Sequence, residues 1–157
     1  PRYFPPLNFG VVESDLYRCG HPQVINFPFL ESLKLRTIIY VGDKTNNWDY
    51  YRWIQRQPQP VGFVHVPLDL DLAAAAASDA SAAATAAQLN YLLAVVAHSA
   101  NYPILIHSNK GKHRVGVVVA LIRKLLQGWV LAAVYDEYGK YAKHGKDNSE
   151  LQFIEFF

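Results

Sequence analysis

The stretch "ILIHSNKGKHRVG", Ile104–Gly116, decides the expected fold, because it combines a strand, a tight turn and the start of a helix. The run "PILIH" is short and apolar, which indicates a buried strand. The apolar pattern of "RVGVVVALIRKLLQG" is too long for a strand, so it predicts a helix that stops at Gly128. Gly111 eases the turn between them. A strand that leads through a short turn into a helix indicates a βαβ unit.

The rest of the chain continues this alternation. Strands are predicted in "VVESDLYRCG" (two, around a turn at 13–15), "RTIIYVG" and "GFVHVP". Helices are predicted in "NFPFLESLKL" with Asn26 as N-cap, "NNWDYYRWIQRQ", residues 81–99, "VLAAVYDEYGKYA" and "NSELQFIEFF". We therefore expect one α/β domain over residues 1–157, with a central, mostly parallel sheet of about four or five strands covered by helices on both faces. Ligands of such sheets bind beyond the carboxyl ends of the strands, where the loop after "PILIH" lies.

Charge is unevenly distributed along the chain. The net charge is only +2, but residues 80–135 contain no Asp or Glu. The cations of that span are Lys110, Lys112, Arg114, Arg123 and Lys124. A local positive field of this kind suits an anionic ligand. Arg123 and Lys124 are equally compatible with a solvated basic face.

Composition excludes several classes of protein. Cys19 is the only cysteine, which rules out an intramolecular disulfide and zinc sites built from several cysteines. The six histidines show no metal-ligand spacing, so neither a metal nor another cofactor is expected. No apolar run approaches the roughly 18 residues of a membrane span, and "PRYFPPLNFG" is not a signal pattern. We expect a cytoplasmic protein that binds neither membranes nor nucleic acid.

Residues 73–87, "AAAAASDASAAATAA", differ from the rest of the chain. Alanine is the strongest helix former, so part of this run could begin the helix predicted over residues 81–99. The run itself offers no side-chain chemistry. A natural low-complexity insert, an engineered replacement and unknown side chains written as alanine all remain open.

The loop between the strand and the helix has the features of an anion site. Successive backbone N–H groups from Asn109 to His113 can point inward as a nest, and the positive end of the following helix faces the same point. Arg114 can clamp phosphate oxygens through a bidentate guanidinium. Lys110, Lys112 and His113 add positive charge at the rim, a density that suits several phosphates on one ligand.

The spacing within this loop resembles a known signature. His107 and Arg114 bracket the loop with Ser108 six positions before the arginine, which resembles the His-Cys-x5-Arg signature of cysteine-dependent phosphatases. The segments "NKGKHRVG", "LIRKLLQGW", "YDEYGKYA", "LQFIEFF", "PPLNFGVV" and "LYRCGHPQVINFPFLESLKLRTIIYV" resemble the atypical dual-specificity phosphatases of plants and fungi. That family includes proteins linked to oxidant-induced cell-cycle arrest and others that cleave inositol pyrophosphates. The resemblance covers the chain except about residues 43–88, and it implies a dual-specificity-phosphatase-like fold with an inositol pyrophosphate or a phosphoprotein as ligand.

Two positions depart from the family pattern. Ser108 stands where the family has its nucleophilic cysteine, and a serine hydroxyl is a poor nucleophile without an adjacent base. Val115 stands where active members usually place the Ser or Thr whose hydroxyl assists the departing sulfur. Two losses in one loop favour a natural pseudophosphatase, which could sit in a hetero-oligomer of related chains. The alternative is an active phosphatase carrying a Cys-to-Ser change that traps a ligand. A scaffold without ligand binding is disfavoured by the retained basic loop.

The resemblance also suggests supporting residues. Asp69 or Asp71, in "VPLDLDL", would be the general acid, although two exposed charges that alternate with apolar residues are the preferred interpretation. His107 would brace the loop through hydrogen bonds, either as part of the site or as a buried structural histidine. Cys19 is interpreted as a small buried residue.

Overall fold

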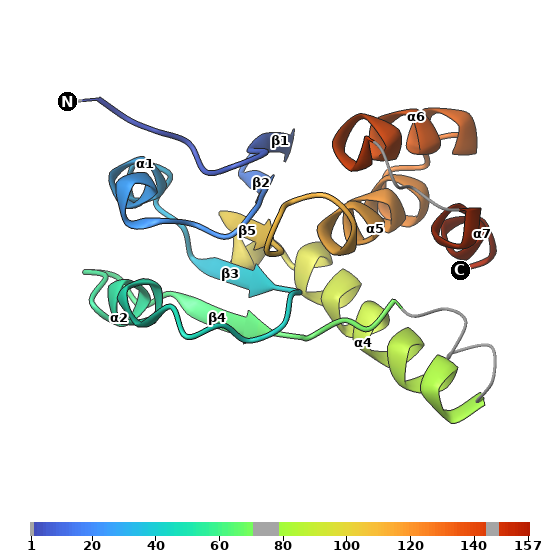
Figure 1. The fold of residues 1–157 in the computed structure, drawn as a ribbon, viewed down its shortest axis with the longest axis horizontal. Helices are drawn as coiled ribbons and strands as arrows, with labels where there is room; N and C mark the ends of the chain where they lie inside the picture. The colour runs from blue at the N-terminus through green and yellow to red at the C-terminus, as the bar shows by residue number, and fades with distance from the viewer. Residues whose placement is uncertain (1, 71–78, 144–147) are drawn as a thin grey trace.

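The computed structural model describes residues 2–70, 79–143 and 148–157. Its centre is a five-stranded sheet in the order β1-β2-β5-β3-β4 (Figure 1). The strands are β1 Gly10–Glu13, β2 Leu16–Cys19, β3 Thr37–Tyr40, β4 Gly62–His65 and β5 Ile104–His107. β1 pairs with β2 in antiparallel fashion, and the pairs β2–β5, β5–β3 and β3–β4 are parallel. The predicted mostly parallel sheet is confirmed.

Helices cover the two faces of this sheet (Figure 1). One face carries α1 Phe27–Ser32 and α2 Trp48–Gln55. The other carries α4 Asp79–Ala97, α5 Arg114–Leu121, α6 Leu131–Ala142 and α7 Asn148–Phe156. Short 3-10 turns occupy Val24–Asn26 and Ser99–Asn101, and a π-helical segment spans Ile122–Leu126.

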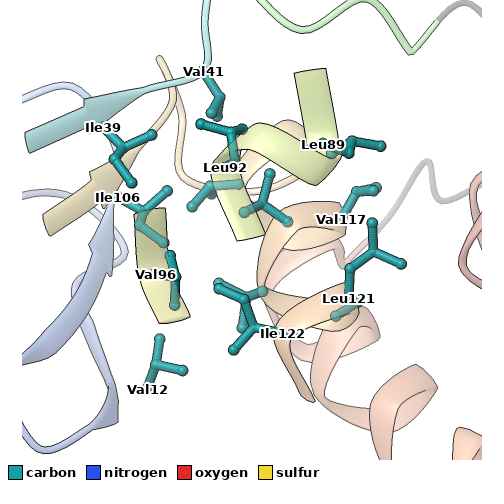
Figure 2. Close-up of a cluster of buried hydrophobic side chains, with 14 of the residues drawn as sticks. Val12, Ile39, Val41, Leu89, Leu92, Val96, Ile106, Val117, Leu121 and Ile122 are labelled. Atoms are coloured by element: carbon teal, nitrogen blue, oxygen red, sulfur yellow. The ribbon is translucent and has the colours of Figure 1, made fainter. Parts of the chain in front are cut away.

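Strand alternation divides the core into two clusters. Ile39 and Ile106 point toward α4 and α5, whereas Ile38 and Leu105 point toward α1 and α2. Figure 2 shows the larger cluster, in which Leu92 of α4 lies between the sheet residues and α5. Each fully buried Leu or Ile contributes roughly 1.5–3 kcal/mol relative to an exposed one. These contacts hold the strand β5 and the helix α5 together, and with them the loop that joins the two.

The helix after the loop differs from the expected single α-helix. It changes from α to π geometry at Ile122 and ends at Leu126, two residues before Gly128, whose φ is +68°. Arg123, expected to bind a ligand or face solvent, is buried instead. Its guanidinium donates to both carboxylate oxygens of Glu137, at 3.0 and 2.9 Å, and to the carbonyl of Val12 at 2.7 Å. The expectation was wrong because the carboxylate of Glu137 and the carbonyl of Val12 satisfy the guanidinium inside the fold, where it can be buried.

Two further expectations need correction. Residues Ala80–Ala97 form a helical window of 18 residues with mean hydropathy 1.4, long and apolar enough to cross a membrane by these criteria alone. The statement that no such run exists was therefore wrong, although α4 buries Leu89 and Leu92 in the core. Residues 73–78 of the alanine run lie outside the described residues. Asn26 precedes α1 as expected, but its side chain does not cap that helix, because its Oδ1 accepts from the backbone N–H of Gln23.

Candidate anion-binding site

The loop from Ser108 to His113 joins the carboxyl end of β5 to the amino end of α5 (Figure 1). Ser108 is only 4% exposed, and its Oγ accepts a hydrogen bond from the backbone N–H of Gly111 at 2.9 Å. The serine oxygen therefore lies inside the turn that the loop describes. Gly111 has φ +75°, and a Cβ there would lie 2.6 Å from the Gly20 nitrogen. Only glycine fits this turn.

Two neighbouring segments hold the loop in place. The backbone N–H of His21 donates to the carbonyl of Asn109 at 3.0 Å. The Asn8 side chain donates to the carbonyl of Lys110 at 2.8 Å. Both acceptors are loop carbonyls, so these two carbonyl oxygens are engaged by protein groups outside the loop. The loop is fixed from the N-terminal segment and from the end of β2 together.

His107 is the fully buried residue that precedes the loop. Its Nδ1 lies 3.1 Å from the carbonyl of Ser108, which can only accept, so Nδ1 carries the proton. Its Nε2 therefore accepts from the hydroxyl of Tyr50 at 2.6 Å. Burial lowers the pKa of His107 to about 3, so the imidazole is neutral. Both ring nitrogens of His107 are therefore occupied, one by Tyr50 and the other by the first residue of the loop.

Side chains at the carboxyl ends of neighbouring parallel strands lie side by side. Cys19, His107, Tyr40 and His65 end four adjacent parallel strands and are in register. Tyr40 stacks on His107 with ring centroids 4.5 Å apart and on His65 at 4.9 Å. Burial raises the pKa of Tyr40 to about 12, so its hydroxyl keeps its proton. That hydroxyl contacts the Asn109 side chain and the Asp43 carbonyl, which ties the loop after β3 to the anion loop.

Arg114 begins α5 and has an acidic partner. Its Nη2 lies 3.3 Å from Oδ2 of Asp43, and the two side chains are 30% and 73% exposed. The guanidinium is therefore partly exposed, on the first residue of α5 and directly after the loop. Asp43 was not identified from the sequence. Its position after the buried strand β3, at the carboxyl end of the sheet, was the signal that could have found it.

His113 links the loop to the C-terminal helix. Its Nδ1 lies 3.2 Å from Oε2 of Glu150 and 3.4 Å from the hydroxyl of Tyr138. It was expected to add charge at the rim, and its half-buried side chain instead contacts α6 and α7. Lys110 is exposed and Lys112 half-buried, so the loop keeps two lysines near its surface.

The other predicted residues lie in different environments. Asp69 is exposed, on the segment after β4 at the same end of the sheet, and Asp71 lies outside the described residues. Val115 is fully buried in the core, beneath the first turn of α5. Cys19 is also buried, and burial keeps its pKa far above the usual thiol value, which fits the interpretation as a packing residue.

Within the described part of the chain, no group of three or more His, Cys, Asp or Glu could hold a metal ion. A cavity of about 590 Å³ lies at the opposite end of the sheet from the loop, against α1 and α2, with Ile38 and Trp53 among its lining residues. It is separate from the loop residues described above.

The loop closes on a buried residue, lies between a parallel strand and a helix, and is followed by an arginine at the start of that helix. This fold and this loop are typical of the cysteine-dependent phosphatases. The profile of the tyrosine phosphatase family matches residues 3–157. The chain belongs to this family, which confirms the resemblance noted from the sequence.

Relatives include enzymes and enzyme-like proteins. "Tyrosine-protein phosphatase-like protein OCA2" of Saccharomyces cerevisiae is 42% identical over 99% of this chain and 76% of its own length. "Inositol diphosphatase DSP4" of Arabidopsis thaliana is 31% identical over 99% of this chain and 74% of its own length. Among solved structures, the core catalytic domain of the PP-IP phosphatase SIW14 from S. cerevisiae, in complex with citrate, superposes with a TM-score of 0.82. It is 31% identical, with 99% of this chain and 88% of that chain covered.

Proposed function

We propose that this chain binds a phosphorylated ligand in the loop Ser108–Arg114 and turns it over slowly or not at all, as a pseudophosphatase. The observation that carries the proposal is the hydrogen bond from the Gly111 N–H to Ser108 Oγ. It places an oxygen, rather than a sulfur, at the centre of a loop whose backbone and arginine suit a phosphoryl group.

Poor turnover follows from the surroundings of Ser108. A serine needs a base to remove its proton as it attacks. His107 is the adjacent titratable group, but its Nδ1–H donates to the Ser108 carbonyl and its Nε2 accepts from Tyr50. Neither nitrogen has a lone pair directed at the serine hydroxyl. The loop keeps the features that bind phosphate and lacks the thiolate that would react.

The ligand class is supported by the relatives and by the charge of the loop. Relatives include inositol diphosphatases, and a structural neighbour is a PP-IP phosphatase. Lys110 and Lys112 near the surface, with Arg114 at the mouth, provide more positive charge than one phosphate requires. An inositol pyrophosphate or a phosphoprotein, each carrying several anionic groups, fits this arrangement.

A second candidate is an active phosphatase in which the serine replaces a natural cysteine to trap the ligand. The specific observation in its favour is that the loop is otherwise well formed, with Gly111 and its bracing bonds in place. The native codon at position 108 decides between the two candidates.

The binding proposal is tested by calorimetry with inorganic phosphate. Arg114→Ala is expected to weaken binding by about 2–4 kcal/mol, because it removes a charge-assisted pair. Arg56→Ala removes an equal charge beside the cavity at the opposite end of the sheet and should leave the affinity unchanged. Equal affinities in the wild type and in Arg114→Ala would overturn the assignment of the site.

A further inference from the structure

The acidic partner of Arg114 belongs to a segment that is held firmly against the anion loop. Asp43 follows β3, and its backbone carbonyl contacts the Tyr40 hydroxyl. The preceding Gly42 carbonyl accepts from Nε2 of His65 at 2.8 Å. The space for a Cβ on Gly42 is limited by the Asn109 side chain, 3.0 Å away. The backbone of Asp43 is therefore fixed beside the loop, while its side chain is 73% exposed and can rotate.

We propose that Asp43 is a specificity-determining residue of this site: its carboxylate occupies Arg114 in the free protein and, once displaced, selects against ligands with a second anionic group next to the bound phosphate. The proposal rests on the proposed function, since it assumes that a phosphate binds at Arg114. Asp43 lies outside the loop Ser108–Arg114, so the spacing of the loop residues assigns it no role.

The first step is a competition. The Asp43 carboxylate and a phosphate both offer oxygens to the same guanidinium, so a ligand must displace the carboxylate to form a bidentate contact with Arg114. Exposed ion pairs of this kind are weak. The competition therefore lowers the affinity for an isolated phosphate only a few-fold.

The second step is selection. After displacement, the Asp43 carboxylate remains at the mouth of the loop, because the Tyr40 and His65 contacts keep its backbone in place. An ionised carboxylate only accepts hydrogen bonds. It favours a hydroxyl or an N–H on the group that carries the bound phosphate, and it repels a second phosphate at that position. Of the two ligand classes proposed for the loop, Asp43 therefore favours a phosphoprotein over an inositol pyrophosphate.

The test compares inorganic phosphate with pyrophosphate by calorimetry, in the wild type and in Asp43→Asn. The amide keeps the size of the side chain and removes its charge. We expect Asp43→Asn to bind phosphate about three-fold more tightly and pyrophosphate about ten-fold more tightly, since only pyrophosphate gains at both steps.

Asp136→Asn is the matched control. Asp136 also lies 3.3 Å from its cationic partner, Lys140, and is 72% exposed, but it belongs to the α6 surface. Its variant changes the net charge by the same amount and should leave both affinities unchanged. Unchanged or weaker binding of both anions in Asp43→Asn would overturn the proposal and would make Asp43 a residue that merely orients Arg114.

The two proposals fail in different ways. If Arg114→Ala abolishes phosphate binding but Asp43→Asn shows no preferential gain for pyrophosphate, the proposed function stands and the role of Asp43 falls. If the wild type binds neither anion and Asp43→Asn binds both, the carboxylate blocks the site, so the competition stands and the proposed function of the native chain falls. If neither protein binds either anion, both proposals are overturned.

Discussion

Tyr50 donates its hydroxyl hydrogen to Nε2 of His107 across 2.6 Å, although the two residues are 57 positions apart in the chain. This bond joins α2 to the end of β5, immediately before the anion loop. It also fixes the tautomer of His107, whose Nδ1–H then donates to the carbonyl of Ser108. The loop thus depends on a helix from a distant part of the sequence.

Removing that hydroxyl should cost stability. Tyr50→Phe leaves the buried Nε2 of His107 without its donor, which we expect to lower the free energy of unfolding by about 1–3 kcal/mol. Urea denaturation measures the change. Tyr51→Phe, at a half-exposed neighbouring position, is the control and should change stability by less than about 0.5 kcal/mol. An equal effect of the two variants would contradict the importance of the buried bond.

The neutral state of His107 predicts a pH dependence. Burial lowers the pKa of His107 to about 3 in the fold, whereas histidine in an unfolded chain titrates near 6.5. Below about pH 6.5 the unfolded chain therefore takes up a proton that the folded protein does not. Stability is complete above this pH and falls as the pH decreases from about 6.5 toward 3, by at most about 1.4 kcal/mol per pH unit for one proton.

His21 should add to this slope, because burial also lowers its pKa. Urea denaturation between pH 7.5 and pH 5 measures the combined effect. His107→Gln should make the dependence shallower, while His98→Gln, at an exposed position, should leave it as it is. A slope that is the same in wild type and His107→Gln would show that His107 is not the main source.

Much of the fold follows from local pattern. The strand "PILIH" and the tight turn at Gly111 are recognisable because apolar runs and a glycine at a turn are local properties. The end of α5 was harder to predict from the sequence, because the change to π geometry at Ile122 depends on packing against other elements. Arg123 was misjudged for the same reason: its partner Glu137 lies on α6, and nothing in the sequence pairs the two.

The candidate site was predicted only where its residues are contiguous. Ser108 to Arg114 form one short segment, so the loop could be identified by spacing. Asp43 lies 71 positions before Arg114, and Tyr40 resembles any apolar residue at the end of a buried strand. Asp69 and Asp71 were preferred as acidic candidates because they also follow a strand. The structure brings Asp43 into contact with Arg114, because the β3 strand is the direct neighbour of β5 in the sheet.

Gly111 offers a test of the loop geometry itself. Gly111→Ala combines a positive φ of +75° with a Cβ that would lie 2.6 Å from the Gly20 nitrogen. Gly128 has a similar φ of +68° with no atom within 4 Å, so Gly128→Ala isolates the conformational cost. We expect Gly128→Ala to destabilise the fold by about 1 kcal/mol and Gly111→Ala by about 3 kcal/mol or more, with loss of phosphate binding. Equal losses on denaturation would mean that the loop can shift to admit the methyl group.

Replacing Ser108 tests how much of the catalytic apparatus the loop retains. The wild type should show little or no hydrolysis of an aryl phosphate, for want of a base at the serine. In Ser108→Cys, the loop amides, the amino end of α5 and Arg114 should lower the pKa of the new thiol and support attack on phosphorus. The thiolate then forms a phosphocysteine and releases the aryl alcohol, and water must cleave that intermediate in a second step.

Val115 should limit the second step. It is fully buried at the first turn of α5 and carries no hydroxyl to assist departure of the sulfur. Ser108→Cys alone should therefore give a burst of product followed by slow turnover in stopped-flow assays, and adding Val115→Thr should raise the steady-state rate without enlarging the burst. Val117→Thr, equally buried two residues later, controls for a polar group in this helix. Full turnover in Ser108→Cys alone would favour a trapped active enzyme, because Val115 would then not slow hydrolysis of the phosphocysteine. The absence of a burst in both variants would favour a loop dedicated to binding.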